Sequence, residues 1–196
     1  MVNHRNGIIF SYISLAILCV AGCSSDLSAQ EMTLELDPAN TKVEFTLPDV
    51  LHTVHGTFAM KSGLIHFNPS NGSAAGFVLV DVKSGQSGNS TRDRKMHKEV
   101  LESARYPDIV LRPDRVEGQV AADGASTIQV HGTFSIHGAG HEITIPVRVE
   151  ISSGHWTATS HFPVPYVKWE LKNPSTFVLR VDQSVDIDIQ ASGDTH

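Results

Sequence analysis

From residue 42 to residue 189 much of the chain alternates apolar and polar positions with a period of two. Val43, Phe45 and Leu47 alternate with charged or hydroxyl-bearing residues. The same alternation recurs in residues 54–60, 128–136, 143–151, 156–164 and 181–189. A period of two gives each strand one apolar face and one face toward water. We expect about eight to ten antiparallel strands, a number that favours a closed barrel or a tight sandwich.

Short glycine-containing turns between these segments predict hairpins. Ser62–Gly63 lies between Met60 and Ile65, and Ser153–Gly154 lies between two further apolar runs. Residues that face each other across a two-residue turn must lie on the same face of the sheet, and both spacings satisfy this condition. The strands are therefore expected to follow one another as a meander.

One helix interrupts the strands at about residues 91–103. Ser90 and Asp93 have the spacing of a capping box, which makes Ser90 the predicted N-cap. Pro107 prevents the helix from continuing beyond that point. We expect this helix to lie near one opening of the barrel. The proline-rich stretch 163–174 is expected to be a loop.

The inner face of the barrel is the main candidate for a binding site. A barrel of about eight strands either fills its interior with side chains or holds one small ligand, and periodicity alone does not separate these alternatives. The expected inner positions are Phe45, Phe58, Phe67, Val78, Val80, Phe134, Ile145, Val147, Trp156 and Phe162. Tyr166 and Trp169 are expected to border an opening.

The N-terminal residues have the features of a secretory signal. A short polar start with Arg5 precedes an apolar run, and the run ends in small residues directly before Cys23. This pattern favours a lipoprotein signal over residues 1–22, lipidation of Cys23, a flexible tether over 23–33, a barrel over 34–191 and a tail over 192–196. The alternative is an ordinary signal that is cleaved later, for instance after Ala29. Both interpretations place the barrel outside the cytoplasm.

Charge and cysteine content exclude several classes of protein. The sequence of 196 residues has 15 Lys and Arg against 21 Asp and Glu, a net charge of −6. A nucleic-acid partner would require the opposite sign. The two cysteines, Cys19 and Cys23, both lie in the N-terminal segment. The barrel therefore has no disulfide, no cysteine-based metal site and no thiol nucleophile.

Three patterns of reactive side chains have simpler structural explanations. His131, His155 and His161 share a polar face, but they lack the spacing that holds a metal, so solvated histidines are favoured. Asp182, Asp186 and Asp188 face water together, whereas glycoside chemistry needs two carboxyl groups inside a cleft, so a solvated outer face is favoured. The stretch 84–88 only partly resembles a nucleophile elbow. The sequence thus predicts no catalytic residue, no metal and no cofactor.

Three motifs in this order resemble the YceI family of bacterial extracytoplasmic lipid-binding proteins. They are Val54-His55-Gly56-Thr57-Phe58, then Thr91-Arg92-Asp93 leading to Tyr106-Pro107-Asp108-Ile109, and then the stretch from Val130 to Gly138. The resemblance covers residues 34–189. It implies an eight-stranded lipocalin-like barrel with an apolar tunnel for polyisoprenoids, fatty acids or their amides, and no catalytic residues. Bulky Tyr166 and Trp169 depart from the family's glycine-containing, phenylalanine-rich stretch and would shorten or cap the tunnel.

These observations together predict binding, storage or transport of an isoprenoid-like or other long-chain lipid in the cell envelope. The alternative is a structural or interaction protein of the envelope whose barrel is filled and holds no ligand. The expected partners are the lipid and, through lipidated Cys23, a membrane. A homodimer is compatible with the family resemblance, although no sequence feature requires it.

Overall fold

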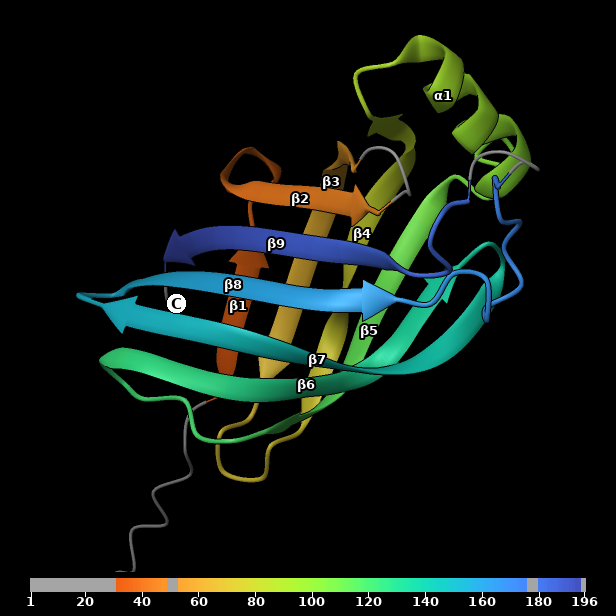
Figure 1. Ribbon diagram of the computed structural model, residues 1–196. Coiled ribbons are helices and arrows are strands. Elements are labelled where there is room, and N and C mark those ends of the chain that lie inside the picture. Colours follow the sequence, from red (N-terminus) through yellow and green to blue (C-terminus); the bar gives the residue numbers. More distant parts are fainter. Residues whose placement is uncertain (1–30, 49–52, 176–179, 195–196) are drawn as a thin grey trace, which may run out of the picture.

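In this computed structural model the described residues form one antiparallel sheet of nine strands. The sheet closes on itself (Figure 1). The structure describes residues 31–48, 53–175 and 180–194. The strands are β1 (Met32–Leu36), β2 (Thr41–Leu47), β3 (Val54–Phe67), β4 (Ala74–Gln86), β5 (Asp108–Glu117), β6 (Gly124–Ile136), β7 (Ala139–Ser152), β8 (His155–Val164) and β9 (Val185–Asp194). The alternation of apolar and polar residues that predicts these strands also decides which face of each strand is buried.

The nine strands occupy eight positions around the barrel, because β1 and β2 follow one another at a single position. Both pair with the same side of β3, as Leu34 opposite Ile65 and Phe45 opposite Gly56 show. The 3₁₀ turn η1 (Pro38–Asn40) separates them. Pairing of β2 with β9 and of β3 with β4 then closes the barrel. The predicted closed antiparallel barrel is confirmed.

The predicted turn at Ser153–Gly154 is confirmed, and the predicted turn at Ser62–Gly63 is wrong. Ile151 pairs with Trp156 around Ser153–Gly154, as expected. Ser62–Gly63 is not a turn, because β3 runs straight through it. Met60 pairs with Val80 while Ser62 pairs with Leu79, so Lys61 forms a β-bulge. A bulge shifts the strand by one residue and moves the following apolar positions from even to odd numbers.

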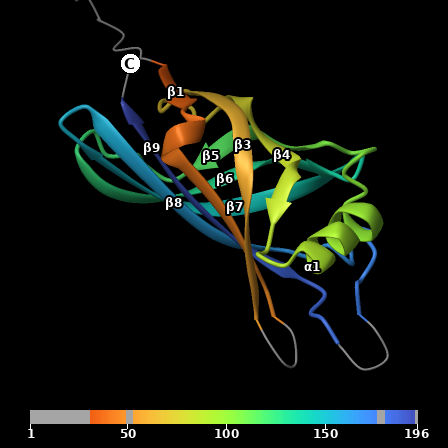
Figure 2. The ribbon, with the colours of Figure 1, turned by 90° about the horizontal axis from the view of Figure 1, so that it is seen from above.

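A short helix lies beside one end of the barrel, as predicted (Figures 1 and 2). Helix α1 (Ser90–Lys95) continues into a π-helical turn, η2 (Met96–Val100). Its N-cap is Asn89 and not Ser90, since the Asn89 side chain accepts hydrogen bonds from the backbone N–H groups of Thr91 and Arg92. The prediction was wrong by one residue because asparagine and serine are equally good caps and the two are adjacent.

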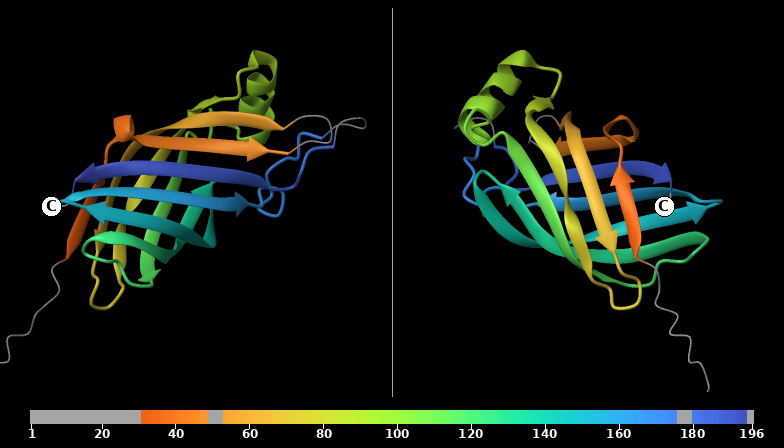
Figure 3. Two further views of the ribbon diagram at one scale, coloured as in Figure 1. Left: turned by 60° about the vertical axis from the view of Figure 1, so that its left-hand side comes forward. Right: turned by 180° about the vertical axis from the view of Figure 1, so that it is seen from behind.

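Several contacts attach this helix to the barrel. His97 Nε2 donates to the Gly85 carbonyl at 2.8 Å, and Lys172 Nζ pairs with the Glu99 carboxylate at 2.7 Å. The ion pair lowers the pKa of Glu99 below its ordinary value. Val100 is buried against the barrel interior. The helix therefore covers the end of the barrel that lies opposite β1 (Figure 3).

The predicted N-terminal segments fall largely outside the described residues. The signal over 1–22, Cys23 and most of the tether over 23–33 are not among them. β1 begins at Met32, and β9 extends to Asp194. No helix within the described parts of the chain is both long and apolar enough to cross a membrane.

Candidate ligand-binding site

An apolar cavity of about 160 Å³ lies inside the barrel, toward the end that carries β1 and the β7–β8 hairpin. Met32, Leu34 and Leu36 of β1 form one part of its wall, and Trp156 and Ala158 of β8 form another. The rest of the wall consists of Ile65, Phe67, Ala74, Leu111, Pro113, Val116, Val120, Ile128, Val130, Ile145, Val147, Val149, Ile151, Thr159, Ser160, Ile189 and Ala191. We refer to this part of the barrel as the hollow half.

The wall of the cavity presents almost no polar groups. Thr159 and Ser160 are the polar residues among the described lining residues, and the Ser160 hydroxyl already donates to the Pro146 carbonyl at 2.8 Å. The Trp156 indole N–H is also satisfied, because it donates to the Asp194 carbonyl at 3.2 Å. An apolar cavity with so few polar groups does not hold water well and favours an apolar occupant.

The other end of the barrel, under the helix, is packed with side chains. Phe134 and Phe162 meet edge to face with ring centroids 6.5 Å apart, and Trp169 lies 5.6 Å from Phe134. The His141 ring stacks on Trp169 at 4.3 Å with an angle of only 4°. The buried members of this cluster are Val82, Val100, Leu101, Phe134, Ile136, Ile145, Phe162, Val164, Tyr166 and Leu171. We refer to this part as the filled half.

Tyr166 fixes the loop that closes the filled half. Its side chain is buried, and its hydroxyl donates to the Asp182 carbonyl at 2.6 Å. Burial, together with the nearby Asp182 charge, raises the pKa of Tyr166 to about 12. The neutral phenol is therefore strongly favoured, which fits a group that is held away from water.

The predicted inner residues divide between the two halves. Phe67, Ile145, Val147 and Trp156 line the cavity. Phe134, Phe162, Tyr166 and Trp169 belong to the filled half, and Phe58 packs against it. Phe45 and Val80 are buried, and Val78 is half-buried, but these three side chains lie outside the cavity wall.

The contribution of β1 to the cavity is not among the predictions from the sequence. Met32, Leu34 and Leu36 alternate with Thr33 and Glu35, so the period-two signal was present. It extends over a single short strand next to the expected tether. The 3₁₀ turn that follows β1 interrupts the alternation, so the pattern of β1 does not continue into β2.

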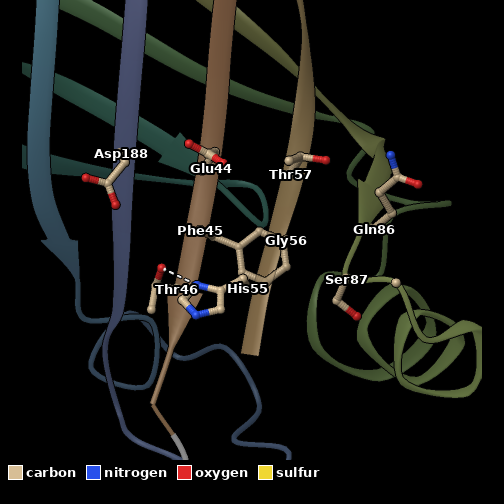
Figure 4. A pocket seen from close by; sticks show the side chains of 10 residues that line it. Glu44, Phe45, Thr46, His55, Gly56, Thr57, Gln86, Ser87 and Asp188 are labelled. Carbon is tan, nitrogen blue, oxygen red and sulfur yellow. Dashed lines mark hydrogen bonds between the residues drawn. The ribbon is translucent and has the colours of Figure 1, made fainter. Parts of the chain in front are cut away.

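A second, more polar depression lies where β2 and β3 approach residues 86–88 (Figure 4). Its volume is about 460 Å³. Thr46 of β2 and His55 of β3 are paired neighbours in its wall, with Thr46 Oγ1 and His55 Nδ1 3.1 Å apart, and Glu44 and Asp188 lie on neighbouring strands. The Phe45 ring rests on Gly56, where even a Cβ atom would lie 2.2 Å from the ring. The glycine thus makes room for this aromatic ring.

The other candidate side chains are occupied by structural contacts. His161 Nδ1 pairs with Asp188 at 2.8 Å, His155 Nδ1 pairs with Asp194 at 3.1 Å, and His131 Nδ1 is 2.8 Å from the Thr144 hydroxyl. Across residues 31–48, 53–175 and 180–194 there is no group of three His, Cys, Asp or Glu that could hold a metal ion.

The serines of the partial nucleophile motif stabilise local backbone. The Ser84 hydroxyl donates to the Asp81 carbonyl and accepts from the backbone N–H of Ala59. The Ser87 hydroxyl pairs with Asp93 in the first turn of α1 and accepts from Arg92. Neither hydroxyl contacts a histidine in these hydrogen bonds, so they hold the β4–α1 connection in place.

Comparison with known proteins agrees with the fold. Residues 34–192 match the family model of the YceI-like domain. The structure of Burkholderia cenocepacia BcnA is similar, with a TM-score of 0.66 and 17% identity over 81% of this chain and 99% of that chain. A Saccharophagus degradans domain described as polyisoprenoid-binding gives a TM-score of 0.66 and 14% identity over 83% and 98% of the two chains.

A YceI protein of Campylobacter jejuni is also similar, with a TM-score of 0.59 and 16% identity over 72% of this chain and 84% of that chain. No curated protein sequence matches the chain. At these low identities the solved structures show a shared fold.

Proposed function

Since the chain belongs to the YceI-like domain family, we propose that it binds the apolar chain of a lipid inside the hollow half of its barrel. The observation that carries this proposal is the cavity inside the barrel, whose wall is almost wholly apolar. Moving each methylene of a ligand from water into such a cavity is worth about 0.8 kcal/mol. An isoprenoid-like lipid is the favoured ligand class, supported by the description of the Saccharophagus degradans domain as polyisoprenoid-binding.

The chemistry of the wall supports binding rather than catalysis. No titratable side chain is present among the described residues that line the cavity. A general acid or base must come within hydrogen-bond reach of the atom it serves. A lipid chain in this cavity would meet hydrocarbon side chains and the satisfied hydroxyl of Ser160.

We propose that the protein acts in the cell envelope, anchored through Cys23. The proposal is supported by the small residues that precede Cys23 at the end of the N-terminal apolar run. Met32 lines the cavity, and at most about 30 Å of extended chain connects it to Cys23. Such an anchor would hold the hollow half close to a membrane that supplies or receives the lipid.

The anchor is tested by changing Cys23→Ser and measuring how the protein divides between membrane and soluble fractions. We expect release from the membrane fraction or blocked maturation. Cys19→Ser is the matched control, since Cys19 lies inside the apolar run and should not affect anchoring. Unchanged membrane partitioning of the Cys23→Ser protein would contradict the lipoprotein assignment.

The filled half supports a second candidate function. If the hollow half also stays empty in the cell, the protein is a structural or interaction component of the envelope. Native mass spectrometry of the purified protein, followed by organic-solvent extraction and analysis of the extract, separates the two functions. The lipid-binding function predicts a stoichiometric apolar ligand, and the structural function predicts none.

A pair of adjacent substitutions on β8 locates the ligand. Ala158→Trp places a large ring inside the cavity and should abolish lipid copurification. Thr157→Trp adds the same ring on the exposed outer face and should leave lipid binding unchanged. Circular dichroism checks that both variants keep their strands. Full lipid occupancy in the Ala158→Trp protein would place the ligand elsewhere.

A further inference from the structure

We propose that the filled half limits how far a lipid chain can enter, so that the barrel accepts only a short apolar segment, and that Ile145 is the residue at which this segment stops. The inference rests on the proposed lipid-binding function. The family resemblance implies a continuous tunnel. In this proposal the packed, helix-covered half of the barrel instead forms the floor of the cavity.

Ile145 stands at the boundary between the two halves. It lines the cavity and is also a buried member of the filled cluster, with only 2% of its surface exposed. Leu111 and Ile189 border the cavity at the same boundary and pack against the same cluster. A chain that enters from the β1 end would therefore reach Ile145 before it reaches the rings of Phe134 and Phe162.

The filled half beyond Ile145 is packed with aromatic and aliphatic side chains. The edge-to-face rings of Phe134 and Phe162 occupy the barrel, and Trp169 covers Phe134 from the loop side. To pass them, a ligand would have to unstack Trp169 from His141 and displace the loop held by Tyr166. Packed interiors resist such insertion, because added volume forces side chains out of their favoured rotamers and shifts the backbone.

The size of the cavity sets the length of the inserted segment. An apolar cavity of roughly 150 Å³ is known to take one benzene molecule, with its six carbon atoms. The cavity here, at about 160 Å³, has room for a similar amount of hydrocarbon. The preferred ligands are therefore lipids or alcohols that insert a terminal segment of about six carbons, roughly one isoprene unit. The rest of a longer chain would remain outside the barrel.

The test uses linear primary alcohols of increasing length, from four to sixteen carbons, offered together to the purified full-length protein and followed by native mass spectrometry. Affinity should rise about fourfold with each added carbon while the carbon is buried. It should then level off near six carbons, because later carbons stay in water. Ile145→Ala should move this plateau to about nine carbons, since the substitution removes three side-chain carbons from the floor.

Ile136→Ala is the matched control. Ile136 is buried in the same cluster but does not line the cavity, so the identical truncation should lower stability without moving the plateau. If either alanine variant fails to fold, Ile145→Val and Ile136→Val replace the pair, with an expected shift of about one carbon for Ile145→Val alone.

The outcomes distinguish this inference from the proposed function. A plateau near six carbons that moves only with residue 145 supports the inference. Affinity that keeps rising beyond twelve carbons in the unchanged protein would overturn the inference and leave lipid binding intact. Equal shifts in the two variants would also overturn it. Failure of every alcohol to bind would count against the proposed function itself.

Discussion

The two halves of this barrel are built from the same strands but differ in what fills them. β6, β7 and β8 each contribute inner side chains to both halves. In the hollow half these are mostly β-branched or small, such as Val147, Val149 and Ala158. In the filled half β6 and β8 each supply a phenylalanine, and residues 166–171 fold back over the opening.

This difference shows that strand alternation decides which face is buried but not whether the buried space is full. The hollow half closes with side chains from strands and hairpins alone. The filled half also receives Tyr166, Trp169 and Leu171 from the loop after β8, and Val100 and Leu101 from η2 and the residue that follows it. Segments outside the strands thus fill one half of the barrel interior with an ordinary packed core.

The largest contrast between the halves is expected from deleting a ring in the filled half. Phe162 is 3% exposed and packs edge to face on Phe134. Phe162→Ala should lower the free energy of unfolding by about 3–5 kcal/mol, because it leaves a cavity in a packed core. Chemical denaturation measures this loss. A loss below about 1 kcal/mol would mean that the filled half is loosely packed.

Adding side-chain volume should change the free energy of unfolding in opposite directions in the two halves. Val164 is 2% exposed in the filled half, so Val164→Phe overpacks the core and should cost about 1–3 kcal/mol. Ala158→Leu places new carbons in the cavity and should stabilise the ligand-free protein by about 0.5–2 kcal/mol. Thermal unfolding of both variants after lipid extraction tests this reversal. Destabilisation by both would show that the hollow half is already full.

The division into a hollow half and a filled half could not be predicted from the sequence, for a physical reason. Period-two alternation in β6 and β7 predicts correctly that Phe134 and Ile145 point inward. Whether space remains beside them depends on long-range packing of Trp169 and the helix, which no local pattern encodes. Tyr166 and Trp169, which the family resemblance expects to shorten the tunnel, lie in the filled half, and their effect on a ligand stays a prediction.

The error at Ser62–Gly63 has an equally specific cause. The inner apolar positions change from even to odd numbers between Met60 and Ile65, and both a two-residue turn and a single bulge produce that change. The structure has the bulge. Lys61, at the bulge, turns outward to Asp108 at 2.6 Å, and this pair raises the pKa of Lys61. The actual turn follows Phe67, where Gly72 has a φ of 74°.

A smaller effect on stability is expected at the N-cap of α1, and it also distinguishes the two halves. Asn89→Ala removes the side chain that caps α1 and should lower stability by about 1 kcal/mol. Ser90→Ala is the matched control, because Ser90 lies within the helix and its substitution should cost much less. Since the helix covers the filled half, alcohol binding in the hollow half should not change. Weaker binding in Asn89→Ala would connect the helix to the cavity.

The smallest prediction concerns the single hydroxyl that Tyr166 places in the filled half. Tyr166→Phe removes its hydrogen bond to the Asp182 carbonyl and should cost about 0.5–1.5 kcal/mol near neutral pH. The native pKa of about 12 lies above the ordinary value of 10.0, so folding favours the protonated phenol. This stabilisation is complete below pH 10 and is lost as the pH rises from 10 toward 12.

The stability difference between the wild-type protein and Tyr166→Phe should therefore shrink over that interval, and other groups that titrate there cancel in the comparison. Ultraviolet titration of the folded protein should show one tyrosine that ionises near pH 12 and disappears in the variant. If Tyr166 instead ionises near pH 10, solvent reaches the filled half, and the floor at Ile145 loses its physical basis.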